Sequence, residues 1–420
     1  MLRLVYTVLI YVAAPLALLA NLWRSLRDPL YRQRLGERFG FTAVRAERSL
    51  WVHAVSVGEV QAAAALIREL IKRHPQRPLI VTTGTPTGAQ RVQALFGASV
   101  RHVYLPYDTP GSVRRFLDRI QPRIAVVMET EVWPNLFREI ARRGIPLVIA
   151  SARLSPKSVR GYRRLASLFK DALASGIQIA AQTAGDAERF IAVGANPAHT
   201  HVVGNIKFDL EVAEEVRARG RAFRASCCAD REVWIAGSTH AGEEDMVLDA
   251  HAVLRRAHPN ALLVLVPRHP QRFDDVKANL RGRSIEFAAR STGAAVGVTT
   301  SVLLVDTLGE LMMFYAASDI AFVGGSLVPI GGHNLLEPAA LSLPIVTGPH
   351  NFNSPDVARA LLEREGAIQV RTGDELAATL KSLFDNASQR ERLGAAAFAF
   401  VTENRGAVQR LLALIESHAG

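Results

Sequence analysis

Acidic side chains follow apolar stretches of this 420-residue chain at points where strands of a sheet would end. The stretch Leu50–Val55 leads through a small Gly58 turn to Glu59, which would open the next helix. The helix dipole favours the charged form of a carboxylate there, so Glu59 suits a general base that must be ionised. An ordinary helix-capping glutamate fits the same position equally well.

A second group of charged residues lies further along the first half. Glu129 and Glu131 follow the apolar stretch Ile124–Met128, a spacing that is hard to explain as core. Lys207 follows the last strand of the half and can hold a phosphate or carboxylate as a point charge. A solvated linker lysine is the more common case, so both interpretations stay open.

The second half carries residues suited to a nucleotide. Arg268 stands between two prolines, which holds its guanidinium ready to fork onto a phosphate or carboxylate. Four glycines lie between a buried strand and a helix start in residues 324–332, and glycine lets backbone approach a ligand closely. His333 and Asn334 follow, and Glu337 lies where a carboxylate can accept from both hydroxyls of a ribose.

Three common nucleotide and metal motifs are absent from this sequence. The glycine loop does not have the GxGxxG pattern of NAD and FAD sites, and no GxxxxGK[ST] loop of NTPases occurs. No DxD-like metal pair is evident, and the only cysteines, Cys227 and Cys228, are adjacent. A disulfide scaffold and a Cys/His metal site are therefore excluded, and a reducing compartment is expected.

Apolar, β-branched runs alternate with amphipathic helical patterns in both halves, which predicts two buried parallel sheets. The expected fold is α/β, with two Rossmann-like doubly wound domains and a boundary near residues 205–230. In such sheets the working residues lie at the carboxyl ends of strands. A nucleotide in the second half, an acceptor in the first and a cleft between them is the layout of a two-Rossmann glycosyltransferase.

The N-terminus predicts a membrane segment. Residues 4–23 carry no charge, and about 20 apolar residues suffice to cross a bilayer. Five arginines follow within residues 24–38 and one precedes, which places the body on the cytoplasmic side by the positive-inside rule. A signal peptide would carry its cations in front instead. Pro15 would kink a spanning helix, so a tilted or partly inserted anchor is an alternative.

The charge is unevenly distributed along the chain. The net charge is +11, but residues 1–210 balance to +15 and residues 211–420 to −4. The basic half fits nucleic acid, an anionic membrane or an anionic substrate. A general arginine habit is the plain alternative, because 44 of the 50 cations are Arg.

The order of the motifs along the whole chain resembles the 3-deoxy-D-manno-octulosonic acid (Kdo) transferases of lipid A assembly. Small departures, Val132 for a usual Leu and Asn205 for a common Ser, touch no proposed chemical group. The motifs that carry the resemblance are Arg38-Phe39-Gly40, His53-Ala54-Val55-Ser56-Val57-Gly58-Glu59, Thr85-Pro86-Thr87-Gly88, Tyr104-Leu105-Pro106-Tyr107-Asp108, residues 128–135 and 151–155, Pro267-Arg268-His269-Pro270, Gly324-Gly325-Ser326-Leu327, Gly332-His333-Asn334 with Glu337, and residues 348–353.

The resemblance implies a GT-B fold with an anchor helix over residues 1–23, an acceptor domain over 24–209 and a nucleotide-sugar domain over 210–420. It implies an inverting transfer of Kdo from CMP-Kdo to a glucosamine hydroxyl of the tetraacyl lipid A precursor, on the cytoplasmic face of a bacterial inner membrane. Partners would be CMP-Kdo, the lipid A precursor and the anionic lipid surface, with no nucleic acid, no metal and no further cofactor.

The resemblance also assigns residues. Glu59 would be the general base, and Glu129 and Lys207 would stabilise the transition state. CMP would be held by Pro267, Arg268, Leu308, Gly309, Glu310, Asn334, Leu335, Leu336 and Glu337.

Two other classes of function remain open on the residues alone. One is a related transferase or epimerase acting on a nucleoside-diphosphate sugar, which would prefer UDP to CMP. The other is a non-enzymatic membrane adaptor, which leaves the glycine loop unexplained.

Overall fold

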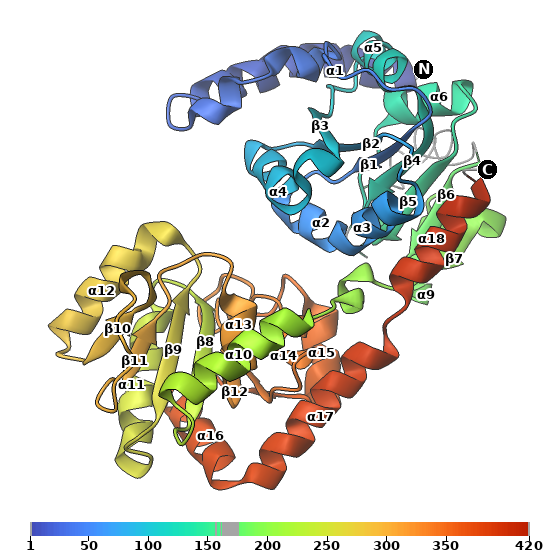
Figure 1. The fold of residues 1–420 in the computed structure, drawn as a ribbon. Helices are drawn as coiled ribbons and strands as arrows, with labels where there is room; N and C mark the ends of the chain where they lie inside the picture. Colours follow the sequence, from blue (N-terminus) through green and yellow to red (C-terminus); the bar gives the residue numbers. More distant parts are fainter. Residues whose placement is uncertain (1, 156–157, 160, 162–175, 419–420) are drawn as a thin grey trace. The chain divides into compact units, whose positions relative to one another are not determined.

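The chain folds into two compact units in the computed structural model, which describes residues 2–155, 158–159, 161 and 176–418. The first unit comprises Met1–Asp209 together with Arg405–Gly420, and the second comprises Leu210–Asn404. Each unit is built around one seven-stranded parallel sheet. The predicted α/β class with two doubly wound sheets is confirmed (Figure 1).

The sheet of the first unit has the strand order β3-β2-β1-β4-β5-β6-β7. The chain therefore builds outward from β1 in one direction and then restarts at β4 on the other side of β1. The carboxyl ends of β1 and β4 flank this topological switch point, where open α/β sheets bind their ligands. The strands are β1 Ser49–His53, β2 Leu79–Thr83, β3 Arg101–Tyr104, β4 Pro122–Met128, β5 Leu147–Ala152, β6 Gln178–Ala181 and β7 Thr200–Val202.

Both faces of this sheet are covered, because alternate strand residues enter different cores. Along β1, Leu50 and Val52 pack into one core, while Trp51 packs into the other with its ring edge-on to Phe116. This burial on both faces is why the strands read as continuous apolar runs. The helices in the described part of the unit are α1 Leu2–Arg24, α2 Val57–Ala62, α3 Ala64–Arg73, α4 Pro86–Phe96, α5 Pro110–Ile120, α6 Pro134–Arg142, α9 Ala184–Ala192 and α18 Ala407–His418.

The second unit repeats this plan, except that β11 lies between β9 and the edge strand β10. Its strand order is β10-β11-β9-β8-β12-β13-β14, so its switch point lies between β8 and β12. Along β8, Trp234 and Ala236 enter one core and Val233 and Ile235 enter the other. The strands are β8 Val233–Thr239, β9 Leu262–Pro267, β10 Phe287–Ala289, β11 Val302–Leu304, β12 Ile320–Val323, β13 Ile345–Thr347 and β14 Ala367–Gln369.

Helices of very different length follow these strands. The shortest is α14, a single turn over Leu336–Ala339, and Asn334 Oδ1 accepts the Leu336 N–H at its start (3.1 Å). The helices of the unit are α10 Glu214–Cys227, α11 Glu243–Ala257, α12 Phe273–Gly282, α13 Leu311–Ala316, α14 Leu336–Ala339, α15 Pro355–Glu363, α16 Gly373–Asp385 and α17 Ala387–Glu403.

The end of the chain returns to the first unit. The prediction assigned all of residues 210–420 to the second domain, but Arg405–Gly420 belong to the first. The reason is the apolar face of α18, where Val408, Leu411 and Ile415 complete the core over β1 and β4. Asp209, the last residue before the second unit, accepts hydrogen bonds from the N–H groups of Gly406 (2.5 Å) and Val408 (2.5 Å). The chain therefore leaves the first unit and returns to it at neighbouring positions.

The N-terminal helix α1 is long and apolar enough to cross a membrane, the one such helix among the described residues. Only 6% of its most apolar window is buried. One face nonetheless contacts the first unit through hydrogen bonds near both ends, from the Tyr6 hydroxyl to Asp108 (2.8 Å) and from the Asn21 amide to the Tyr107 hydroxyl (3.2 Å).

Candidate active site

Glu59 lies at the switch point of the first unit, in the first turn of α2. Ser56 caps this helix by accepting the Glu59 N–H (3.3 Å), and the Glu59 carboxylate accepts the Val55 N–H (2.8 Å) and the Ser56 hydroxyl (3.3 Å). This pattern is a variant of the capping box, in which the carboxylate binds the N–H of Val55 and the hydroxyl of the cap residue Ser56. The helix-capping interpretation of Glu59 is therefore correct, and it leaves the carboxylate half-buried rather than fully enclosed.

The surroundings of Glu59 favour proton transfer near neutral pH. Burial raises the pKa of Glu59 to about 7, and the negative charges of Glu129 and Glu131 add to the rise against the opposing Val55 N–H. A general base works best when its pKa lies near the operating pH. The same carboxylate can thus cap a helix and accept a proton.

Glu129 and Lys207 meet beside this carboxylate. The Lys207 ammonium lies 3.3 Å from Glu129 Oε1, and both side chains keep about a third or more of their surface exposed (41% and 32%). Glu129 follows β4 with a φ of +57°, a left-handed conformation that costs a non-glycine residue energy. Such strain occurs preferentially at functional sites. The structure therefore brings Glu59, Glu129 and Lys207, predicted from three separate stretches, to one region.

Lys207 and Glu131 complete this region. Lys207 belongs to the short 3-10 turn Ile206–Asp209, in which its N–H donates to Asn205 Oδ1 (3.0 Å). Burial raises the pKa of Glu131, and the charge of Glu129 adds to that effect. The region thus contains three carboxylates and one ammonium, which is enough to hold a proton and to balance charge that develops during a reaction.

The backbone of the glycine-rich loop in the second unit donates hydrogen bonds to a carboxylate from another part of the same unit. Glu243, fully buried at the start of α11, accepts the N–H groups of Gly325 (2.7 Å), Ser326 (3.1 Å) and Leu327 (2.9 Å). Gly324 packs so closely on the Ser238 carbonyl that a Cβ there would lie 2.6 Å from it. These three amide groups are thus taken by the protein, and close backbone packing explains Gly324.

Arg268 and Glu337 occupy the carboxyl edge of the second sheet. Arg268 follows β9 and is exposed, with its N–H bonded to the Thr239 carbonyl (3.0 Å). Burial raises the pKa of Glu337, opposed by a hydrogen bond from the Asn334 amide (3.2 Å) and by the charge of Arg268. An exposed cation therefore lies near a half-buried carboxylate that a neighbouring amide orients.

The other residues predicted to hold CMP differ in what they can offer. Pro267 ends β9 beside Thr239 of β8, while Leu335 and Leu336 are buried, so only their backbone can meet a ligand. Three of the predicted residues follow β11. Leu308 is 70% exposed, Gly309 has a φ of +85°, and Glu310 comes next. The Glu310 carboxylate already pairs with Arg290 (2.9 Å).

Three histidines that the sequence prediction did not group also meet at this edge. His240 Nε2 lies 2.8 Å from His333 Nε2 with the two rings parallel (4°), and His269 packs edge-on against His240. Burial lowers the pKa of His333 to about 4, helped by the nearby His240 and Arg268. They follow β8, β9 and β12, three adjacent strands, so the strand-end rule that found Arg268 finds them too. Among the described residues no cluster of three or more His, Cys, Asp or Glu side chains is arranged to hold a metal ion.

Two Rossmann-like units with polar residues at their switch points define the GT-B class of fold. A solved structure with this fold is a putative UDP-N-acetylglucosamine 2-epimerase from Listeria monocytogenes, which matches with a TM-score of 0.58. The match covers 89% of this chain and 97% of that one at 15% sequence identity, so the likeness concerns the fold alone. The predicted fold class is confirmed.

Sequence comparison gives the family. Residues 33–210 match the family described as 3-deoxy-D-manno-octulosonic-acid transferase (kdotransferase). The 3-deoxy-D-manno-octulosonic acid transferase of Haemophilus influenzae is 43% identical over 99% of this chain and 98% of its own length. That of Bordetella pertussis is 38% identical over the full length of both chains. The chain belongs to the Kdo transferase family, and the predicted enzyme class, a glycosyltransferase, is confirmed.

Proposed function

We propose that this enzyme transfers Kdo from CMP-Kdo to a glucosamine hydroxyl of an acylated lipid A precursor, with inversion at the transferred carbon. The observation that carries the proposal is Glu59, a carboxylate at the switch point with a pKa of about 7. An inverting transfer needs one base to take the proton of the attacking hydroxyl and no covalent intermediate.

Glu59 is the base in this reaction. It accepts the proton of the acceptor hydroxyl as the oxygen attacks the Kdo carbon, and the bond from that carbon to the CMP phosphate breaks. The pair of Glu129 and Lys207 (3.3 Å) is proposed to stabilise the charge that develops in the transition state. Because the ammonium keeps an exposed face, it can contact a substrate oxygen without first losing its partner.

The second unit is proposed to hold the nucleotide. Arg268 can neutralise the phosphate of CMP, and Glu337, oriented by Asn334, can accept from the ribose hydroxyls. The backbone of Pro267, Leu308, Gly309, Leu335 and Leu336 would surround the nucleotide, and Glu310 would hold that edge through Arg290. CMP leaves as a phosphate monoester whose charge a guanidinium can balance, so the proposal includes no metal and no cofactor besides CMP-Kdo.

The first unit is proposed to work at the cytoplasmic face of the inner membrane. The outward face of α1 carries Leu4, Val8 and Val12, each more than half exposed, and five arginines follow within residues 24–38. The excess of positive charge over residues 1–210 suits an anionic leaflet and a phosphorylated acceptor.

Mass spectrometry of the product from purified protein, CMP-Kdo and lipid A precursor tests this proposal and counts the Kdo units added. We expect a mass increase of whole Kdo units, unchanged by EDTA. Competition between CMP and UDP for the protein separates the proposal from a nucleoside-diphosphate-sugar enzyme, since preference for UDP would contradict it. Arg268→Ala should weaken CMP binding about tenfold, whereas Asp275→Asn, on the exposed face of α12, should not.

A further inference from the structure

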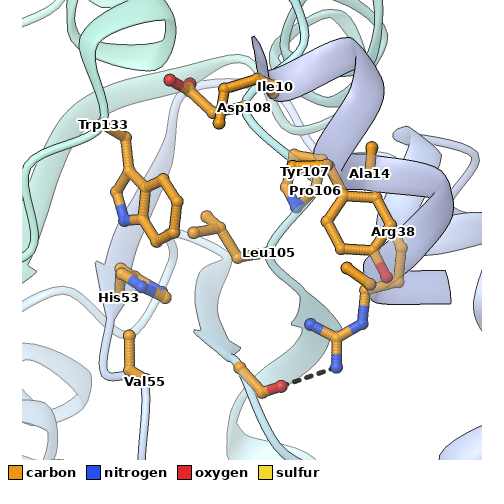
Figure 2. A pocket seen from close by; sticks show the side chains of 13 residues that line it. Ile10, Ala14, Arg38, His53, Val55, Leu105, Pro106, Tyr107, Asp108 and Trp133 are labelled. Carbon is orange, nitrogen blue, oxygen red and sulfur yellow. Dashed lines mark hydrogen bonds between the residues drawn. The ribbon is translucent and has the colours of Figure 1, made fainter. Parts of the chain in front are cut away.

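A cavity of about 350 Å³ lies between α1 and the rest of the first unit (Figure 2). Its volume is at the lower end of the roughly 300–1,000 Å³ typical of small-molecule sites. On the α1 side the wall consists of Ile10 and the small residues Ala13, Ala14 and Ala17. The outward face of the same helix carries Leu and Val instead, so the small side chains leave room where the helix meets the domain.

The domain side of the cavity is mainly apolar, but His53, Arg38, Tyr107 and Asp108 also line it. The Asp108 carboxylate is already taken, because it accepts the Tyr6 hydroxyl and the N–H groups that follow Trp133. Leu105 and Trp133 line it, together with His53 and Arg38 (Figure 2). His53 is fully buried, its Nδ1 lies 2.8 Å from Thr82 Oγ1, and its Nε2 has no hydrogen-bond partner within the described part of the chain. An unpartnered buried polar atom costs free energy unless a ligand or water meets it.

Arg38 gives this cavity a cationic end. Its guanidinium donates to the Gly84 carbonyl (2.7 Å) and stacks over the ring of Tyr104, 4.2 Å from the ring centre. It is half-buried, with no acidic side chain in hydrogen-bond contact among the described residues. A site with apolar walls, a buried polar group and one cation fits an amphiphile whose head is anionic.

The cavity also adjoins the proposed base. Val55 lines it, and the Val55 N–H donates to the Glu59 carboxylate (2.8 Å). The wall of the cavity therefore includes a residue that is hydrogen-bonded to the group proposed to take the proton.

Polar contacts hold α1 against the cavity. The Tyr6 hydroxyl donates to Asp108, which also accepts the Asn135 N–H (3.0 Å), and the Thr7 hydroxyl donates to Asn135 (3.1 Å). These contacts place α1 as a fixed wall whose inner face meets the cavity and whose outer face is free for lipid.

We propose that this cavity binds one acyl chain of the glycolipid acceptor, with α1 as its outer wall and Arg38 beside the anionic head. The inference rests on the proposed function, because it takes the acceptor to be an acylated, phosphorylated glucosamine. It adds that α1 selects the substrate as well as attaching the enzyme to the bilayer.

Quenching of tryptophan fluorescence tests occupancy independently of transfer. The full-length protein carries Trp23→Phe, which removes the exposed tryptophan of α1, while Trp51 and Trp234 are fully buried. The probe is an acylated glucosamine phosphate with brominated chains, compared with a brominated phosphatidylcholine. We expect saturable quenching by the glycolipid that disappears when Trp133→Phe is added. Quenching by phosphatidylcholine at the same concentrations, or quenching that survives Trp133→Phe, would overturn the proposal.

Filling the cavity tests its role in turnover. Ala14→Phe, on the buried face of α1, should raise the KM for the long-chain acceptor about tenfold and should remove the preference for long over short acyl chains. Its matched control, Ala20→Phe, lies on the exposed face of the same helix and should retain both values. An unchanged KM and chain preference in Ala14→Phe would refute the acyl site.

The two tests separate this inference from the proposed function. If the unmodified protein transfers no Kdo to any acceptor, the proposed function fails, and the quenching result still decides whether the cavity holds a glycolipid chain. If transfer occurs but the quenching does not depend on Trp133, or Ala14→Phe leaves KM and chain preference unchanged, the cavity proposal alone fails.

Discussion

The two switch points have the same topology and use a carboxylate in opposite ways. In the first unit Glu59 follows β1, accepts one backbone N–H and remains half-buried. In the second unit Glu243 follows β8, accepts three N–H groups from the loop after β12 and is fully buried. Position after a strand therefore does not decide the role of a glutamate.

The difference lies in how many of the carboxylate's bonds the protein itself provides. Burial raises the pKa of both residues, but three loop amides oppose the rise at Glu243 and hold that side chain in place. At Glu59 the neighbouring charges come from other carboxylates, which increase its affinity for a proton. The arrangement around Glu243 favours a structural role, and the arrangement around Glu59 favours proton transfer.

The sharpest test of the comparison is Glu59→Gln. Kdo transfer should fall by about 10²–10⁴-fold, the usual contribution of a general base, while CMP binding persists because the proposed nucleotide residues lie in the other unit. Steady-state kinetics and equilibrium binding measure the two. The exposed Glu47→Gln in the same unit is the control, and full activity of Glu59→Gln would disprove the base assignment.

Glu243→Gln should alter the second unit instead. Loss of the charge-assisted bonds should cost about 1.5–3 kcal/mol, so the amides of residues 325–327 should exchange hydrogen at least tenfold faster. Exchange measured by mass spectrometry reports this, with Asp275→Asn as a surface control in the same unit. If Glu59→Gln had the same effect on these amides, the distinction between the two carboxylates would be lost.

The pH dependence of kcat/KM should follow Glu59. The base must be deprotonated, and its pKa is raised to about 7, so activity should rise about tenfold per pH unit below 7 and level off above it. The residual activity of Glu59→Gln should lack this limb. A limb at the ordinary glutamate value of 4.5 would show that the surroundings do not raise the pKa during catalysis.

The smallest expected effect concerns the contact between Glu129 and Lys207. Because both side chains are partly exposed, their coupling should be at most about 1 kcal/mol, measured on kcat with Glu129→Gln, Lys207→Met and the double variant. Each single variant should still lower kcat if both groups act on the transition state. Single variants with unchanged kcat would assign the pair to structure alone.

The sequence predicted the α/β class because strands buried on both faces are apolar throughout, as β9 illustrates. The strand-end rule located Glu59, Glu129 and Arg268 for the same reason. It did not predict that the loop amides near Gly325 bind Glu243, because that contact joins residues 82 positions apart. Nor did it place α18 on the first unit, since an amphipathic helix shows that it has a partner and not which one.

The return of α18 to the first unit has a consequence for how the protein is made. The second unit is an insertion within the first, because the chain leaves at Asp209 and re-enters at Arg405. Val408, Leu411 and Ile415 complete the core over β1 and β4, so that core stays open until nearly the whole chain has been synthesised. Domains usually fold in order from the N-terminus during synthesis. Here the C-terminal half can finish first, and the half with the proposed base becomes complete last.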